Sequence, residues 1–175
     1  MIRIGTLTVG VALIASLSAP VDAGTVEENK QVVLDMTQAI NARDLDALDS
    51  YMAPDIRRHS NATPGLVVEN RNQFKAFLEA DFASVPDSFQ TVNIILGEGD
   101  KVAVHATYEG TQAGNFGPFP PSGKRLKIAF IGILRLEDGL IAEIWVEWDN
   151  LNALTQLGHF PPPEANASRE VSADE

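Results

Sequence analysis

The dipeptide Asp138-Gly139 constrains the fold most, because it joins two long segments in which apolar and polar residues alternate. An Asp-Gly connection favours a two-residue β-hairpin, since both central positions of a type I′ turn have positive φ. Residues 125–137 and 140–148 are therefore predicted to pair as antiparallel strands, with Glu137 facing Leu140. Continued along the hairpin, this register makes four further pairs: Glu143 with Leu134, Trp145 with Gly132, Glu147 with Phe130, and Asp149 with Ile128.

The predicted pairing brings three carboxylates, Glu143, Glu147 and Asp149, onto one face beside apolar side chains such as Phe130. An ionised carboxylate is unfavourable on such a surface, so its pKa rises, or it finds a partner or reaches water. A carboxyl group with a raised pKa is suited to giving and taking protons. We therefore interpret this face as the wall of a pocket that is partly apolar and partly acidic.

A purely structural interpretation of the same acids stays open. Glu143 and Glu147 would then be exposed near a sheet edge, and Asp149 would cap the helix that follows it. The opposite strand face is also apolar, with Ile131, Ile133 and Val146 among its residues. A sheet with two apolar faces needs a cover on each, which predicts helices on one side and another subunit on the other.

Helical patterns dominate the first half of the chain and strand patterns the second. Apolar residues recur at helical spacing over 26–41 and 71–83, and a short helix is expected from the N-cap Asp44 to about Met52. The segment 56–60 is extended. Alternation then predicts strands over 88–96 and 102–112, a loop rich in Gly and Pro, the hairpin, and a closing helix over 149–157. Helices followed by an antiparallel sheet predict one α+β domain.

The two ends of the chain differ from this domain. Arg3, the apolar run 4–17 and small residues before Gly24 predict a cleaved signal peptide over 1–23, and hence a secreted or periplasmic protein. A retained N-terminal anchor is the alternative. The tail, residues 161–175, is rich in Pro, Ala, Ser and acids, which is typical of disorder. The domain is therefore expected to span 24–160.

Composition excludes several classes of function. The net charge of −11 argues against a nucleic-acid partner and against contact with anionic membrane surfaces beyond the leader. The chain has no cysteine, which rules out thiol nucleophiles and cysteine-ligated metals. Its three histidines lack the spacing of a metal site, and no metal ligands are predicted.

Several motifs match a known family at consistent spacing. They are NARDLDAL (41–48), His59 ahead of Pro64-Gly65, GTQAG (110–114), GPFPPSGK (117–124), DGLIAEIW (138–145), Asp149 and QLG (156–158). Together they resemble the SnoaL-like polyketide cyclases and the related ester cyclases over roughly residues 26–158. The chain departs from the family pattern at Gln112, where His is usual, and at Ser122, where Thr is usual.

The resemblance implies the nuclear-transport-factor-2-like fold, an α+β cone whose curved antiparallel sheet is covered by N-terminal helices around a deep pocket. It also implies homodimers formed through the sheet. In such cyclases an acidic residue acts as general acid and base in an intramolecular aldol closure, with no metal or cofactor. Asp149 matches the family's late Asp and is expected to be the catalytic residue.

Five further residues are expected to bind substrate: His59, Gln112, Phe130, Glu143 and Trp145. A loop role with backbone hydrogen bonds is the alternative for His59, and Gln112 can orient a carbonyl but cannot shuttle a proton at neutral pH. The expected substrate is a small, largely apolar carbonyl or hydroxyl compound, closed or isomerised without a cofactor. The alternatives are a non-catalytic module that binds a small ligand and an adaptor that binds another protein.

Overall fold

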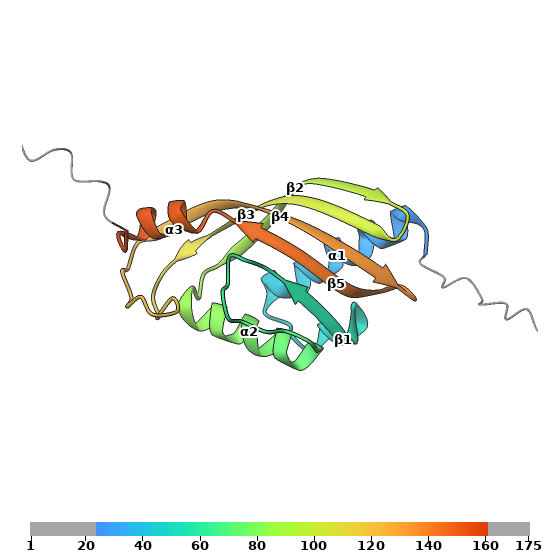
Figure 1. The fold of residues 1–175 in the computed structure, drawn as a ribbon, viewed down its shortest axis with the longest axis horizontal. Coiled ribbons are helices and arrows are strands. Elements are labelled where there is room, and N and C mark those ends of the chain that lie inside the picture. The colour runs from blue at the N-terminus through green and yellow to red at the C-terminus, as the bar shows by residue number, and fades with distance from the viewer. Residues whose placement is uncertain (1–23, 161–175) are drawn as a thin grey trace, which may run out of the picture.

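The computed structural model describes residues 24–160. Figure 1 shows a curved sheet with two long helices against one of its faces. In chain order the elements are α1 (Val26–Ala42), the 3-10 helix η1 (Ala47–Ser50), β1 (Met52–His59), α2 (Arg71–Ser84), β2 (Phe89–Glu98), β3 (Lys101–Thr111), β4 (Arg125–Glu137), β5 (Leu140–Trp148) and α3 (Asn150–Leu157). The predicted α+β class is confirmed.

The sheet is mixed rather than purely antiparallel. Its strands lie in the order β1-β5-β4-β3-β2, and each pair from β2 to β5 is antiparallel. β1 joins β5 in parallel, with Arg58 beside Ile144 and His59 beside Trp145. The extended segment expected over 56–60 therefore starts earlier, at Met52, and forms an edge of the sheet.

Both long helices begin at caps that the sequence encodes. Thr25 and Glu28 form a capping box at α1, in which each side chain accepts a hydrogen bond from the other residue's backbone N–H. Asn70 caps α2 by accepting a hydrogen bond from the Gln73 N–H at 2.9 Å. These caps satisfy N–H groups that a helix leaves unpaired, and so fix where each helix starts.

The core lies between these helices and the inner face of the sheet. Val33 and Ile40 of α1, Leu78 of α2, and Leu134 and Ile144 of the hairpin are all buried there. A second, smaller core lies under α3, formed by Val85, Leu126, Ile128, Ala153 and Leu157. Both cores pack against the inner face of the sheet.

The β4–β5 hairpin has the predicted turn but not the predicted register. Asp138 and Gly139 have φ values of 51° and 75°, as the Asp-Gly turn requires. Glu137 pairs with Leu140 and Leu136 with Ile141, but Arg135 then pairs with Glu143, so Ala142 is an extra residue in β5. Such a β-bulge shifts every later pair by one position and exchanges the two faces of the strand.

The expected pairs beyond the turn are therefore wrong. The structure pairs Arg135 with Glu143, Leu134 with Ile144, Ile133 with Trp145, Gly132 with Val146, Ile131 with Glu147 and Phe130 with Trp148. Glu143, Trp145 and Glu147 lie on the outer face, away from the helices, while Val146 and Trp148 face inward. The bulge follows from burial, because it turns the apolar residues inward and leaves the carboxylates in water.

Two glycines of the GTQAG motif allow the end of β3 to pack closely on the end of α2. A Cβ on Gly110 would meet Val85 Cγ1, and a Cβ on Gly114 would meet the Ala83 carbonyl oxygen. The backbone N–H groups of Ala113 and Gly114 both donate to the Ser84 carbonyl at 2.9 Å. Any larger side chain at these glycines would push the loop away from α2.

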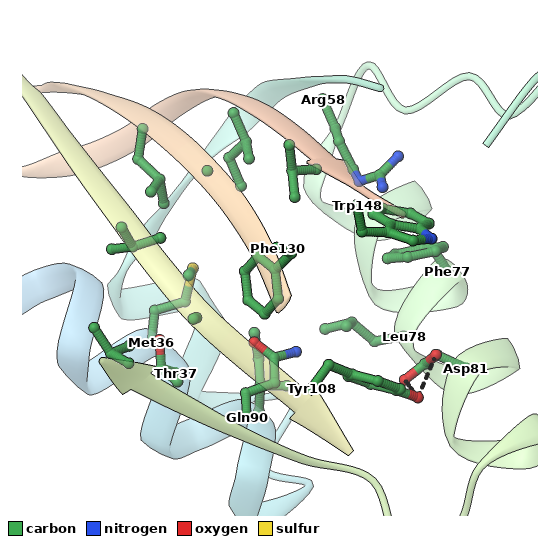
Figure 2. Close-up of a pocket in the computed structure, with 18 of the residues that line it drawn as sticks. Met36, Thr37, Arg58, Phe77, Leu78, Asp81, Gln90, Tyr108, Phe130 and Trp148 are labelled. Carbon is green, nitrogen blue, oxygen red and sulfur yellow. Dashed lines mark hydrogen bonds between the residues drawn. The ribbon is translucent and has the colours of Figure 1, made fainter. Parts of the chain in front are cut away.

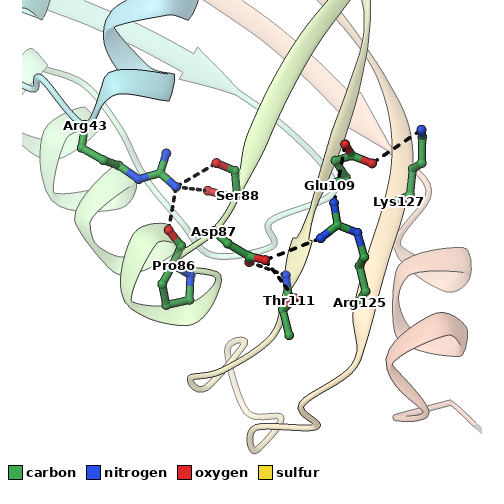
Figure 3. Close-up of polar contacts among 8 residues, drawn as sticks. All are labelled: Arg43, Pro86, Asp87, Ser88, Glu109, Thr111, Arg125 and Lys127. Carbon is green, nitrogen blue, oxygen red and sulfur yellow. Dashed lines mark hydrogen bonds and ion pairs between the residues drawn. The ribbon is translucent and has the colours of Figure 1, made fainter.

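Polar contacts fix the connection from α2 to β2 (Figure 3). Arg43 Nη2 donates to the Pro86 and Ser88 carbonyl oxygens at 2.9 and 2.8 Å. On the other side, the Asp87 carboxylate accepts hydrogen bonds from the Thr111 N–H and hydroxyl at 2.6 and 2.9 Å. The connection that follows α2 is thus tied both to Arg43 at the end of α1 and to Thr111 at the end of β3.

The predicted signal peptide and tail, residues 1–23 and 161–175, lie outside the described residues. Their assignments stay predictions. Within residues 24–160, no helix combines the length and the apolar character that crossing a membrane requires.

Candidate active site

An apolar cavity of about 190 Å³ lies between the helices and the inner face of the sheet. Its walls come from α1, α2 and strands β1 to β5, as Figure 2 shows in part. The apolar lining includes Met36, Phe74, Leu78, Phe130, Val146 and Trp148. We call this space the inner chamber.

A second space of about 450 Å³, the outer chamber, lies between α2, the loop after β1 and the Pro/Gly loop. It shares five lining residues with the inner chamber: Thr63, Phe77, Asp81, Phe116 and Trp148. These residues lie at the boundary between the two chambers, which we call the neck. A ligand that reached the inner chamber by way of the outer one would pass this neck.

Asp81 is a carboxyl group in this largely apolar surface. It projects from α2 toward β3, where Tyr108 Oη donates to its two carboxyl oxygens at 3.0 and 3.1 Å (Figure 2). Burial raises the pKa of Asp81 to about 6, although the Tyr108 hydrogen bond and the positive charge of Arg43 oppose this shift. Asp81 therefore titrates close to neutral pH, where a general base or acid is most effective.

Tyr108 keeps its proton. Burial, followed by the charge and the hydrogen bond of Asp81, raises the pKa of the Tyr108 phenol above its ordinary value. The phenol consequently acts as a fixed donor that orients the Asp81 carboxyl group. The two residues lie on different elements, so their contact depends on the packing of α2 against β3.

Three other polar side chains reach the chambers. Thr37 lines the inner chamber, and its hydroxyl donates to the Val33 carbonyl within α1. Gln90 lines the same chamber, and its side-chain amide has no hydrogen-bond partner among residues 24–160. Arg58 of β1 is buried in the wall and donates to Thr63 Oγ1 at 2.9 Å.

The structure places the residues predicted from sequence in three different environments. Phe130 lines the inner chamber, in agreement with its expected role in an apolar wall. Glu143, Trp145 and His59 do not line either chamber. They lie together on the outer sheet face, where His59 Nε2 is 2.8 Å from Glu143 Oε1 and the His59 ring stacks on Trp145.

The outer-face acid is neutralised by its neighbours. Glu143 also accepts a hydrogen bond from Arg135 Nε at 3.1 Å. Although burial raises the pKa of Glu143, the hydrogen bonds from His59 and Arg135 outweigh it and hold that pKa below its ordinary value. The register expected for Glu143 and Trp145 was wrong because the bulge at Ala142 reverses the faces of β5. His59, which was expected from the family resemblance, lies beside Trp145 on the adjacent strand. A role of these three residues in binding substrate stays a prediction.

Gln112 organises a loop instead of facing either chamber. Its side chain is 0% exposed, and its Nε2 donates to the Gly114 and Pro120 carbonyl oxygens at 3.2 and 3.0 Å. His159 Nε2 lies 2.8 Å from Gln112 Oε1. From the sequence, Gln112 was expected to hold polar substrate atoms. In the structure, its amide N–H groups donate to carbonyl oxygens of the loop. The replacement of the family's usual His therefore takes no proton-transfer group from the chamber walls.

Asp149 caps α3. Its Oδ1 accepts a hydrogen bond from the Asn152 N–H at 2.9 Å, and its side chain is exposed at the helix N-terminus. It lines neither chamber. This geometry matches the capping alternative, and acid/base chemistry at Asp149 stays a prediction.

Sequence reasoning missed Asp81, Tyr108 and Arg58. Asp81 had a usable signal, because it follows Phe77 and Leu78 by four and three residues and so shares the apolar face of α2. An acid at an apolar helix position is a candidate for a perturbed pKa. Tyr108 continues the inward alternation of Val104 and Ala106, which by itself indicates only packing. Within residues 24–160, no cluster of three His, Asp or Glu side chains could hold a metal.

The raised pKa of Asp81 predicts a pH-dependent stability difference. Its contribution to stability is fully present below the unfolded pKa and is lost as pH rises through about 6. Asp81→Asn lacks this loss, so its melting temperature relative to wild type should increase between pH 4.5 and 7.5. The change corresponds to at most about 3 kcal/mol. Thermal melts test this prediction, with Asp55→Asn at an exposed position as the control. A melting-temperature difference between Asp81→Asn and wild type that stays constant with pH would contradict it.

Comparison with known proteins agrees with the fold. Residues 30–157 match the family described as SnoaL-like polyketide cyclase, while no curated protein matches the sequence. TsrD from Streptomyces laurentii has a TM-score of 0.71 at 28% identity, over 78% of this chain and 99% of TsrD. AclR from Streptomyces galilaeus, a hydroxylase candidate, has a TM-score of 0.68 at 29% identity, over 79% of this chain and 85% of AclR.

IdmH from Streptomyces antibioticus, a polyketide cyclase candidate, has a TM-score of 0.66 at 29% identity, over 74% of this chain and 98% of IdmH. These neighbours share the nuclear-transport-factor-2-like arrangement of helices around a curved sheet. Because the family match spans most of the chain, the protein belongs to the SnoaL-like polyketide cyclase family.

Proposed function

We propose that this protein is a cofactor-free acid/base enzyme that cyclises or isomerises a small, largely apolar carbonyl compound. The observation that carries the proposal is Asp81, a carboxyl group in the neck of an apolar cavity, held by Tyr108 and with its pKa raised to about 6. The family supports a cyclase or isomerase without assigning the substrate. Aldol-type ring closure is the reaction that this arrangement suits best.

The proposed reaction starts with proton removal. Ionised Asp81 accepts a proton from the carbon next to a substrate carbonyl, and the C–H electron pair forms an enolate. The enolate carbon attacks a second carbonyl of the same molecule, so that a C–C bond forms and the second oxygen becomes an alkoxide. Asp81 then returns the proton to this alkoxide. The product is an isomer of the substrate, and no other reactant is consumed.

The surroundings of Asp81 serve each step. The apolar walls exclude water that would otherwise protonate the enolate, and they keep the carboxyl basic enough to accept a proton. The Tyr108 hydroxyl limits the rise of the Asp81 pKa and directs the carboxyl group. Gln90, whose side-chain amide has no partner among the described residues, is suited to binding a carbonyl oxygen in the inner chamber.

Exchange of α-protons tests this mechanism without a known substrate. With 2-tetralone in D₂O, NMR should show exchange catalysed by wild type, with a rate that rises with pH around a midpoint of about 6. Asp81→Asn should slow it by about 100-fold or more, as expected for loss of a general base. Asp149→Asn should keep the wild-type rate and lose only a helix cap, worth roughly 1 kcal/mol.

The opposite pattern, with exchange lost in Asp149→Asn and kept in Asp81→Asn, would assign the chemistry to Asp149. Retention of a bound compound with no exchange in any variant would instead favour the non-catalytic binding module. Tyr108→Phe separates orientation from proton transfer. It should reduce the rate less than Asp81→Asn does and shift the pH midpoint upward, because the Tyr108 hydrogen bond lowers the Asp81 pKa.

We also propose that the protein is a homodimer formed through the outer sheet face. Ile94 and Leu96 of β2 and Ile131 and Ile133 of β4 are exposed there as large apolar side chains. Exposed apolar patches of this kind mark interaction surfaces. A second copy would bury them.

Sedimentation analysis tests the dimer. Ile131 is 59% exposed on the sheet, whereas Val67 is 63% exposed in the loop after β1. Ile131→Glu should convert the wild-type dimer to a monomer, because a charge would enter the interface, and Val67→Glu should stay dimeric. A wild-type monomer at micromolar concentration would contradict the proposal.

Export through cleavage of residues 1–23 completes the proposed function. The capping box of α1 begins at Thr25, so a cut before Gly24 leaves every described element intact. In an exporting host, N-terminal sequencing of the protein from outside the cytoplasm should give Gly24 as the first residue. Recovery only in the cytoplasm, starting at Met1, would contradict export.

A further inference from the structure

Arg58 is a buried cation in the wall of the inner chamber. Its side chain belongs to a residue only 7% exposed, and β1 alternates so that the preceding Arg57 points outward and is exposed. Arg58 pairs in the sheet with Ile144, an inward-facing residue of β5. Figure 2 shows its guanidinium beside Trp148 and Phe77, at the neck of the cavity.

The guanidinium is held mainly by aromatic faces. Its central carbon lies 4.7 Å from the Phe77 ring centroid and 5.6 Å from that of Trp148. Its Nη1 donates to Thr63 Oγ1 at 2.9 Å, which is the only hydrogen bond of this group among residues 24–160. A guanidinium has several further N–H donors, and these are left without a protein partner in the described part of the chain.

No acidic side chain pairs with Arg58 among the described residues. Burial lowers the pKa of Arg58, and the charge of Glu147 opposes this shift. The two oxygens of Glu147 accept hydrogen bonds from the Asn61 and Ala62 N–H groups at 2.7 and 3.0 Å. Glu147 thereby fixes the loop after β1 and makes no ion pair with Arg58. Burial of a charge without a close counter-charge is unfavourable, and such cations in a cavity wall are suited to an anionic ligand.

We propose that Arg58 binds an acidic oxygen of the ligand, either a carboxylate or the enolate oxygen of a β-dicarbonyl compound. This inference deepens the proposed function and rests on the same cavity. The ligand class is a compact, apolar ring compound with one acidic oxygen. Its apolar body occupies the inner chamber, and its acidic oxygen lies at the neck under Arg58.

The positions of the neck residues give Arg58 a role in the reaction. Phe77, which contacts Arg58, and Asp81 are one helical turn apart on α2, and both line the neck. Arg58 and Asp81 both line the inner chamber, and the proposed ligand contacts both side chains there. As Asp81 removes the proton, negative charge moves to the oxygen, and a guanidinium that donates to this oxygen stabilises the charge.

Calorimetric titration with 2-naphthoate and its neutral analogue 2-naphthamide tests the inference. Wild type should bind the acid at least about tenfold more tightly than the amide, since a charge-assisted bond is stronger than a neutral one. Arg58→Met should lose this preference while still binding the amide. Arg57→Met removes the same charge from the adjacent, outward-facing position, and this variant should keep the preference for the acid. Thermal melts establish that both variants are folded.

Two results would overturn the inference: wild type without a preference for the acid, or a preference that persists in Arg58→Met. If Arg58→Met does not fold, Arg58→Lys takes its place. Lysine keeps the charge but lacks the planar guanidinium, so this variant should retain a reduced preference for the acid. The 2-tetralone exchange assay separates the two proposals. Proton exchange that depends on Asp81, with no preference for the acid, would contradict only the inference about Arg58. A preference for the acid, with no proton exchange, would contradict only the catalytic proposal.

Discussion

The extra residue in β5 at Ala142 decides which side chains the cavity contains. Side chains alternate along a strand, so one inserted residue exchanges the faces of everything that follows. A regular hairpin would have turned Glu143 and Glu147 toward α1 and α2 and left Val146 and Trp148 outside. Burying those carboxylates would cost far more than interrupting the ladder at one position, which explains why the strand bulges.

The bulge also gives the two faces of the sheet different side chains. The inner face carries the apolar walls of the chambers together with Arg58 of β1, which follows the phase of β5. The outer face carries the ion pair of Glu143 with Arg135 and, further along, exposed isoleucines of β4. The paired charges and the exposed isoleucines therefore lie on the face of the sheet opposite the chambers.

Two charged side chains, Asp81 and Arg58, line the inner chamber. Each contacts an aromatic residue, Tyr108 for Asp81 and Phe77 for Arg58, and no ion pair joins the two among the described residues. Such groups are desolvated at a cost to stability, which the surrounding core offsets. Binding sites commonly retain residues of this kind because the strain that they impose on the free protein is relieved by the ligand.

Local patterns in the sequence determined the helices, the strands, the Asp-Gly turn and the family, because caps, periodicity and turn geometry act between residues close in the chain. Phe130 lies on the pocket wall as predicted, because β4 has no bulge and its side chains alternate regularly. The bulge, the parallel edge strand β1 and the meeting of Asp81 with Tyr108 were decided by tertiary structure alone. Each depends on which residues gain burial when distant segments pack, and that free energy is not encoded in the spacing along any one segment.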